Sequence, residues 1–288
     1  MAKFTFFAAL LLAIGATNAA DVNVIELPSF ALADGSGQVN ATLADGSGQV
    51  NATLEERCCL DMIVLMSSYV ALVIGSTGAV GRDLVAELVA SAKCSKVIAL
   101  ARRDVPESAW GSTFPSLDAE AAKSKLEVRQ VDFNSLSEVD IKPSDKVDAA
   151  FSCLGTTRKD AGSAEAFRKV DLEYVTKFAE VSKAVGVPYL GLLTSQGANK
   201  DSWFLYPQTK GEVEDKVQQM KFQRTSIFRP GMLQRGDLLR GTEKMFGWMI
   251  PGTYQIRVKT VAKGMISDYE SGAEGLKEWS HADLKRFE

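Results

Sequence analysis

The sequence predicts an α/β protein built on a doubly wound parallel sheet, with a small helical cap near its C-terminal end. From Val70 onward, short apolar stretches rich in β-branched residues alternate with helical stretches, which is typical of this class. A trio of glycines follows the first apolar stretch directly. The 288 residues, 46% of them hydrophobic, suffice for one large core with accessory segments.

Six strands are expected, over residues 70–74, 96–100, 126–131, 149–153, 189–193 and 225–228. Apolar residues at spacings of three and four predict helices over 79–91 and 163–184. Beyond Pro230 the alternation stops, and residues 237–250 and 260–269 are expected to form the helices of the cap. Substrate determinants would lie there, over the carboxyl ends of the strands.

The N-terminal part does not fit the core. Residues 1–20 have the layout of a secretory signal peptide, and their apolar stretch is too short to span a bilayer. Residues 21–66 contain two copies of an eleven-residue repeat, 32–42 and 43–53, whose composition predicts a disordered linker. Residues 67–288 are expected to form the folded domain. Either the chain enters the secretory pathway, or residues 1–65 are a leader joined to a core that starts near Met62 or Met66.

Composition excludes several classes of function. Lysine and arginine total 33 against 36 acidic residues, so nucleic-acid binding is disfavoured. The cysteines, at 58, 59, 94 and 153, form no C-x-x-C pair, and His281 is the only histidine, so no metal site is expected. The cysteines are expected to be reduced thiols, which suits a reducing compartment.

The glycine trio predicts a dinucleotide site of the Rossmann type. Gly75 permits the tight turn, Gly78 lets the backbone approach a pyrophosphate, and Gly81 allows close packing of helix on strand. A strand before the motif and a helix after it supply the context that the motif requires. The segment expected to contact the cofactor comprises Gly75, Ser76, Thr77, Gly78, Ala79, Val80 and Gly81.

Two arginines indicate which dinucleotide is bound. Arg102 and Arg103 follow the second expected strand, where an acidic residue would bind the ribose hydroxyl of NAD. A guanidinium pair suits a 2′-phosphate, so NADP(H) is favoured, although the pair could also be a solvated surface feature. Further cofactor contacts are expected at the ends of the next strands, from Asp132, Cys153, Leu154 and Gly155.

A second motif, Tyr206-x-x-x-Lys210, predicts proton chemistry. On a helix that begins near Pro207, Tyr206 and Lys210 lie on one face, one turn apart. Ser195 ends a strand eleven residues upstream, at the edge where a nicotinamide would lie, with Thr194 as the alternative hydroxyl. Tyr206 is expected to act as acid and base, because a nearby lysine cation stabilises a phenolate. Ser195 would polarise the carbonyl, and Lys210 would also bind the ribose.

Together these motifs resemble the atypical short-chain dehydrogenases/reductases, in particular the Tat-interacting-protein oxidoreductase family. The resemblance covers about Val70 to the C-terminus and rests on the segments Val-Ile-Gly-Ser-Thr-Gly-Ala-Val-Gly (73–81), Ala-Arg-Arg (101–103), Val-Asp-Phe (131–133), Cys-Leu-Gly-Thr-Thr-Arg (153–158), Leu-Thr-Ser-Gln-Gly-Ala (193–198), Phe-Leu-Tyr-Pro-Gln-Thr-Lys-Gly-Glu-Val (204–213) and Phe-Arg-Pro-Gly (228–231). Residues 1–65 have no counterpart in that pattern.

The resemblance implies a cytoplasmic core that binds NADPH, with Arg229, Pro230 and Gly231 near the nicotinamide. One position departs from the wider superfamily, because Asp171 stands in the long central helix where extended members have asparagine.

The sequence is compatible with three functions. The leading one is an NADPH-dependent oxidoreductase that transfers hydride to an unidentified small-molecule carbonyl substrate. The alternative is a non-catalytic NADPH-binding module that regulates a protein partner. A third reading, a secreted or luminal protein that uses the fold as a scaffold, depends on the signal-peptide-like N-terminus.

Overall fold

The computed structural model describes residues 39–42, 49–52, 68–235 and 254–288, and the chain divides into two units, Met1–Cys58 and Cys59–Glu288. In the first unit, strand β1 (Val39–Thr42) pairs antiparallel with β2 (Gln49–Ala52), and Asn40 lies opposite Asn51. The rest of the predicted linker, the predicted signal peptide and the predicted helix 237–250 lie outside the described residues.

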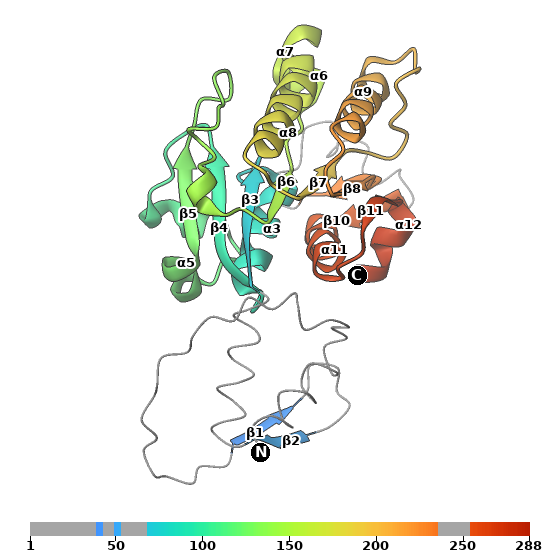
Figure 1. Ribbon diagram of the computed structural model, residues 1–288. Helices are drawn as coiled ribbons and strands as arrows, with labels where there is room; N and C mark the ends of the chain where they lie inside the picture. The colour runs from blue at the N-terminus through green and yellow to red at the C-terminus, as the bar shows by residue number, and fades with distance from the viewer. Residues whose placement is uncertain (1–38, 43–48, 53–67, 236–253) are drawn as a thin grey trace. The chain divides into compact units, whose positions relative to one another are not determined.

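The second unit is built on a seven-stranded parallel sheet in the order β11-β8-β7-β6-β3-β4-β5 (Figure 1). Its strands are β3 (Tyr69–Ile74), β4 (Cys94–Ala101), β5 (Leu126–Gln130), β6 (Ala149–Ser152), β7 (Tyr189–Leu193), β8 (Arg224–Phe228) and β11 (Gly275–Trp279). The order reverses between β3 and β6, and ligands of open α/β sheets bind at such a switch point. A separate two-stranded parallel ladder pairs β9 (Met232–Gln234) with β10 (Gln255–Arg257).

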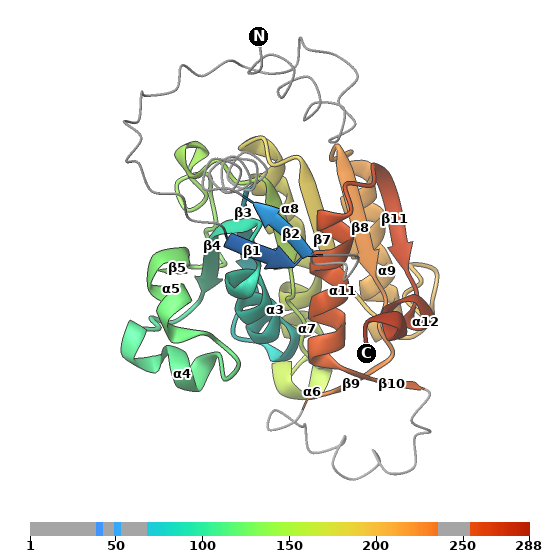
Figure 2. The ribbon, with the colours of Figure 1, turned by 90° about the horizontal axis from the view of Figure 1, so that it is seen from below.

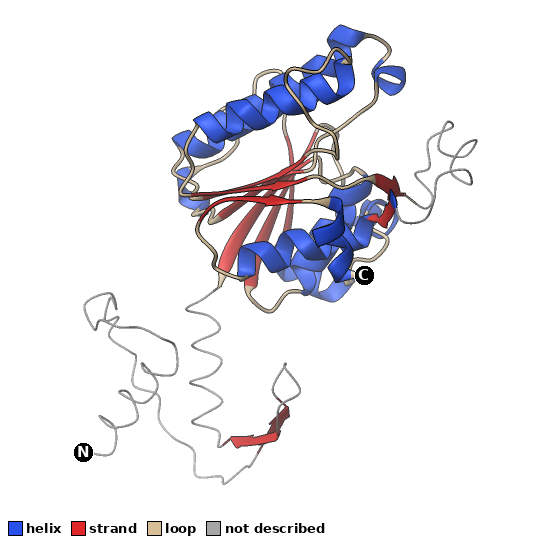
Figure 3. Cartoon of the chain, turned by 90° about the vertical axis from the view of Figure 1, so that its right-hand side faces the viewer, coloured by secondary structure: helices blue, strands red, loops and turns tan. Residues whose placement is uncertain are grey.

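Helices cover both faces of the sheet, which Figure 3 shows edge-on between two helical layers. The α-helices are α3 (Ala79–Ala90), α4 (Trp110–Thr113), α5 (Ala119–Lys125), α6 (Arg158–Ala161), α7 (Ala164–Arg168), α8 (Val175–Ala184), α9 (Leu205–Gln219), α11 (Val258–Glu270) and α12 (His281–Leu284). Short 3-10 turns occupy Glu107–Ala109, Pro143–Asp145 and Lys285–Phe287, and a π-helical segment, Lys169–Tyr174, joins α7 to α8.

The core consists of two layers because the strands alternate. On β3, Ala71 and Val73 pack against α3 and α11, whereas Leu72 and Ile74 pack against α8 and α9. Figure 2 shows α3 and α11 side by side on the first face, where they are in contact. All four strand residues are fully buried, so β3 is a central strand with both faces covered.

The predicted fold class is confirmed, and the six predicted strands form. The prediction that the alternation stops at Pro230 is wrong, because β11 adds a seventh strand beside β8. The predicted helix 260–269 is part of α11, which packs on α3. The predicted helix 163–184 forms in three pieces, since the π-helical segment interrupts it after Arg168.

Candidate functional site

The glycine motif forms a tight loop between β3 and α3. Gly75 has a φ of +74°, and a Cβ there would lie 2.7 Å from the backbone of Cys153, the residue directly after β6. A Cβ on Gly81 would overlap the carbonyl oxygen of Gly75. The turn and the close approach of helix to strand therefore both require glycine, as the sequence predicts.

The first turn of α3 is open to an anion. Gly78 is the N-cap residue, no side chain caps the helix, and the first turn carries no acidic residue. The N–H groups at this end and the helix dipole therefore favour a phosphate group. Ser76 has a different role, because its buried hydroxyl donates to the carbonyl oxygen of Leu100 and ties the loop to β4.

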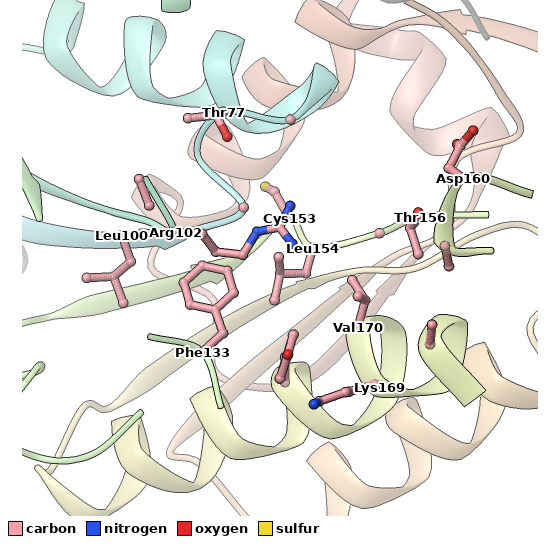
Figure 4. Close-up of a pocket in the computed structure, with 17 residues that line it drawn as sticks. Thr77, Leu100, Arg102, Phe133, Cys153, Leu154, Thr156, Asp160, Lys169 and Val170 are labelled. Carbon is pink, nitrogen blue, oxygen red and sulfur yellow. The ribbon is translucent and has the colours of Figure 1, made fainter. Parts of the chain in front are cut away.

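Three cavities follow one another along the carboxyl edge of the sheet. The central cavity, of about 530 Å³, runs from Gly75, Thr77 and Gly78 across Cys153 and Leu154 to the π-helical segment (Figure 4). The second, the Asp132 cavity, measures about 490 Å³ and shares Arg102, Phe133 and Tyr174 with the central cavity. The third, the Tyr206 cavity, measures about 280 Å³ and shares Gly78 and residues 153–156 with it. Together they form a continuous site.

At the Asp132 end, the two predicted arginines differ. Arg102 lines both adjoining cavities, and Figure 4 shows its side chain reaching into the central one beside Phe133. Both arginines are exposed, but Arg103 lines none of the three cavities. Hydrogen bonds from the backbone and side chain of Asn134 hold the pKa of Asp132 below its usual value, so this wall carries a carboxylate as well.

At the other end, Tyr206 and Lys210 line the same cavity. Both belong to α9, which starts at Leu205 and carries Pro207 in its first turn, as the sequence predicts. The Tyr206 ring stacks on Phe167 with centroids 5.7 Å apart, and 41% of the residue is exposed. Ala79, Val80, Cys153, Leu154 and Gly155, all predicted cofactor contacts, line the same cavity.

Lys210 forms an ion pair with a buried acidic residue, Asp171. Its Nζ lies 2.7 Å from Oδ1 of Asp171, with side-chain exposures of 4% and 0%. The other oxygen of Asp171 accepts the backbone N–H of Thr156 at 2.8 Å. Asp171 lies in the π-helical segment, and such irregular turns are frequent at functional sites. One carboxylate thus fixes both Lys210 and the loop that follows β6.

The surroundings of Lys210 keep it charged. Burial alone lowers the pKa of an ammonium group, but the carboxylate of Asp171, with contributions from Tyr206 and Glu214, more than offsets this effect. The pKa of Lys210 is therefore raised, and the side chain is a cation at neutral pH.

The two predicted hydroxyl residues, Thr194 and Ser195, differ in their surroundings. Thr194 lines the Tyr206 cavity, but its hydroxyl donates to Oε1 of Glu214 at 2.6 Å. Ser195 is not part of the cavity lining, and its Oγ is buried without a hydrogen-bond partner among the described residues. The structure brings Tyr206, Lys210 and Thr194 together, with Ser195 next along the chain.

The segment after β8, residues 229–231, does not line any of the three cavities. Arg229 forms ion pairs with Glu214 and Glu278, each at 2.7 Å, which tie it to α9 and β11. The N–H of Gly231 donates to Nδ1 of His281 at 3.0 Å. None of the three residues Arg229, Pro230 and Gly231 lines the described cavities, so their contact with a cofactor stays a prediction.

Several lining residues were not predicted as site residues, because each is a single side chain whose direction depends on the fold. They are Phe133, Thr156, Lys169, Tyr174, Leu233 and Arg235. Phe133 and Tyr174 meet edge to face with centroids 5.8 Å apart and form an aromatic wall of the Asp132 cavity. The Val-Asp-Phe segment contained a signal for Phe133, but only its aspartate was predicted as a contact.

Two features that the described residues lack concern other classes of site. No group of three or more metal-ligating side chains gathers within residues 39–42, 49–52, 68–235 and 254–288. In the same part of the chain, no helix has the length and apolar character needed to cross a membrane. Cys94 and Cys153 are free, buried thiols.

Solved structures share the fold. MoeE5 in complex with UDP-glucose and NAD superposes with a TM-score of 0.54 at 17% identity, over 72% of this chain and 74% of that chain. The UDP-glucuronic acid 4-epimerase of Bacillus cereus, in complex with UDP-glucuronic acid and NAD, has a TM-score of 0.56 at 13% identity, over 73% and 76%. These likenesses show the fold class, a Rossmann-type doubly wound parallel sheet whose glycine loop follows its first strand.

Sequence relatives define the family more closely. Protein HTATIP2 of Rattus norvegicus is 37% identical over 74% of this chain and 86% of its own length. Protein FMP52, mitochondrial, of Candida glabrata is 34% identical over 74% and 85%. The chain belongs to the HTATIP2 (Tat-interacting protein) family, as its motifs predict. No protein-family model matches the chain.

The predicted location needs a correction. The family resemblance predicted a cytoplasmic core, and the N-terminus resembles a secretory signal peptide. FMP52 relatives from Candida glabrata and Scheffersomyces stipitis are named as mitochondrial proteins, which conflicts with both expectations. The motifs of the core carry no information about location, because they reflect cofactor and proton chemistry alone.

Proposed function

We propose that this chain is an NADPH-dependent oxidoreductase that reduces a carbonyl compound, with Tyr206 as the proton donor. The observation that carries the proposal is that Gly78 of the glycine loop lines the same cavity as Tyr206 and Lys210, and that this cavity shares Gly78 and residues 153–156 with the central cavity. NAD-bound proteins with this fold, such as MoeE5, support a dinucleotide in that groove.

The residues present fit such a cofactor. The open N-terminus of α3 suits the pyrophosphate, and Gly78 leaves the approach free of a side chain. Arg102 suits a 2′-phosphate through paired charge-assisted hydrogen bonds, which favours NADPH over NADH. Phe133 and Tyr174 offer an apolar wall for the adenine ring.

The bound cofactor supplies the hydride that reduces the carbonyl carbon. Tyr206 donates its hydroxyl proton to the carbonyl oxygen, and the cation of Lys210 stabilises the phenolate that remains. Ser195, next to Thr194 of the lining, is the proposed donor that polarises the same oxygen; its buried Oγ has no partner in the described structure and would have to turn toward the cavity to do so. Thr194 is less suited to this step because Glu214 already accepts its proton.

The test is NADPH oxidation across a panel of aldehydes and ketones. Tyr206→Phe should abolish turnover while NADPH still binds, because only the phenolic oxygen is removed. Tyr254→Phe is the matched control, since Tyr254 is 56% exposed and lines none of the three cavities. Equal turnover in Tyr206→Phe and the wild type would refute the catalytic assignment.

One observation favours a second function, a non-catalytic NADPH-binding module that regulates a protein partner. Trp203 and Phe204, exposed by 99% and 77%, project from the loop that leads into the Tyr206 helix. Exposed aromatic side chains of this size are enriched at protein interfaces. In this reading NADPH binding would alter the loop, so hydrogen exchange of residues 199–205 should change on addition of NADPH. Unchanged exchange together with carbonyl turnover would exclude it.

A further inference from the structure

Glu214 is a buried acidic residue on the helix that carries Tyr206 and Lys210. It lies four residues after Lys210 on α9, so the three side chains occupy one face of the helix at successive turns. Only 4% of Glu214 is exposed, and it lines none of the three cavities. The proposed reaction gives this carboxylate no task, although burial of an acid costs free energy unless hydrogen bonds compensate.

Both oxygens of Glu214 accept hydrogen bonds. Oε1 accepts the hydroxyl of Thr194 at 2.6 Å and Nε of Arg229 at 3.0 Å, and Oε2 accepts Nη2 of Arg229 at 2.7 Å. The paired contact with the guanidinium fixes the plane of the carboxylate, because such charge-assisted hydrogen bonds are directional. One oxygen of the carboxylate is thereby directed at Thr194.

Residues 194–196, which follow β7 directly, are also held by the neighbouring strand. The N–H groups at the two ends of this segment donate, at 2.8 Å each, to the carbonyl oxygens of residues 228 and 230. Ser195 lies between these two anchored positions. The hydrogen bond from Thr194 to Glu214 therefore connects the segment that carries Ser195 to helix α9.

We propose that Glu214 is a positioning residue, which sets the distance between the end of β7 and the Tyr206 helix. This inference rests on the proposed reductase function, in which Ser195 and Tyr206 act on one carbonyl oxygen from these two elements. Glu214 lies outside the cavities and acts through the hydroxyl of Thr194. Such positioning matters, because a displacement of about 1 Å can lower a rate about 100-fold.

Glu214→Gln tests the proposal in the carbonyl assay, because it keeps the size of the side chain and removes the charge that orients it on Arg229. The kcat should fall about 10- to 100-fold, while KM and the Kd for NADPH stay within about threefold. Thr194→Val removes the same hydrogen bond without altering the acid–arginine pair, so it should lower kcat similarly and decides the case if Glu214→Gln does not fold.

Glu278→Gln is the matched control. Glu278 binds the same arginine at 2.7 Å but is 44% exposed and does not bind Thr194, so its kcat should stay within about twofold of the wild type. The double variant Glu214→Gln/Thr194→Val should lose no more than about threefold beyond Glu214→Gln alone, because both changes remove one contact. Losses that multiply in the double variant would overturn the proposal, and so would a wild-type kcat in Glu214→Gln.

Hydrogen exchange separates this inference from the reaction itself. In the NADPH-loaded full-length protein, the amides of residues 194–198 should exchange about 3- to 10-fold faster in Glu214→Gln and Thr194→Val than in the wild type or Glu278→Gln. If the wild type reduced no aldehyde but this difference held, the proposed reaction would fail, and Glu214 would still fix the segment that carries Ser195. Unchanged exchange in both variants would overturn the inference, whatever the turnover.

Discussion

Asp171 and Lys210 form a buried ion pair, with Oδ1 and Nζ 2.7 Å apart and almost no exposed surface on either side chain. Because the second oxygen of Asp171 holds the N–H of Thr156, the pair connects the central helix, the Tyr206 helix and the loop after β6. The lysine of the Tyr206 motif is therefore fixed in place before any ligand binds. In the proposed reaction, Asp171 acts as a positioning residue.

Removing the carboxylate should destabilise the protein strongly. Asp171→Asn leaves Lys210 buried without a full counter-charge, which typically costs about 3–5 kcal/mol. Urea unfolding at neutral pH measures the loss. Asp215→Asn is the matched control, since it breaks the exposed pair with Lys200 and should cost less than about 1 kcal/mol. Similar losses in both variants would contradict the role given to the buried pair.

The glycine loop should not tolerate a methyl group at Gly81. An alanine inside a helix usually gains up to about 1 kcal/mol over glycine, but here its Cβ would collide with the carbonyl oxygen of Gly75. We expect Gly81→Ala to lower the melting temperature and to abolish NADPH binding in a fluorescence titration. Gly111→Ala is the control, because nothing lies within 4 Å of its Cβ position. Unimpaired binding in Gly81→Ala would refute the assignment of the loop.

Arg102 should determine the preference for NADPH. Arg102→Ala removes the guanidinium that lines both adjoining cavities, so the Kd for NADPH should rise by about 10- to 100-fold while that for NADH changes little. Arg103→Ala, at an exposed arginine outside the cavities, should change neither affinity. Calorimetry with both cofactors gives the comparison. An equal rise in Kd for NADPH and for NADH would show that Arg102 does not bind the 2′-phosphate.

The buried thiol at the centre of the groove should make stability depend on pH. Burial raises the pKa of Cys153 to about 12, whereas a thiol in an unfolded chain ionises near about 8.5. As the pH rises above about 8.5, the unfolded chain loses this proton first, so the free energy of unfolding falls by up to about 1.4 kcal/mol per pH unit.

Cys153→Ala removes this contribution. Its unfolding free energy should fall less steeply than that of the wild type between pH 8.5 and 10. Cys94, whose pKa burial also raises to about 12, is present in both proteins and cancels in the comparison. Urea unfolding at several pH values provides the two slopes, and identical slopes would contradict the buried-thiol interpretation.

The sequence predicted the parts of the molecule that local patterns determine. The Gly75–Gly81 loop needs only a strand, a turn and a helix that are consecutive in the chain, and the helix of Tyr206 starts where Pro207 places it. Strand β11 was missed because its residues, Gly-Leu-Lys-Glu-Trp, are half exposed at the edge of the sheet and lack an apolar run. Its pairing with β8 becomes visible only in three dimensions.

In the site, too, the features that the sequence did not predict depend on contacts between residues far apart in the chain. Asp171 was noticed as a departure from the superfamily, but its ion pair with Lys210 joins residues 39 positions apart on separate helices. Likewise, Arg235 lines the Tyr206 cavity although no motif surrounds it. The partner of Thr194, Glu214, lies on α9 and could not be inferred from the strand that ends at Leu193.

The central claim, that Tyr206 protonates a carbonyl reduced in this groove, is tested most directly by isotope transfer. The protein would be incubated with NADPH deuterated at the transferable C4 position and a carbonyl substrate from the panel, and the alcohol would be analysed by mass spectrometry. We predict one deuterium in the alcohol from the wild type and no alcohol from Tyr206→Phe, although both bind NADPH equally. Deuterated alcohol formed at the same rate by both proteins would contradict the account.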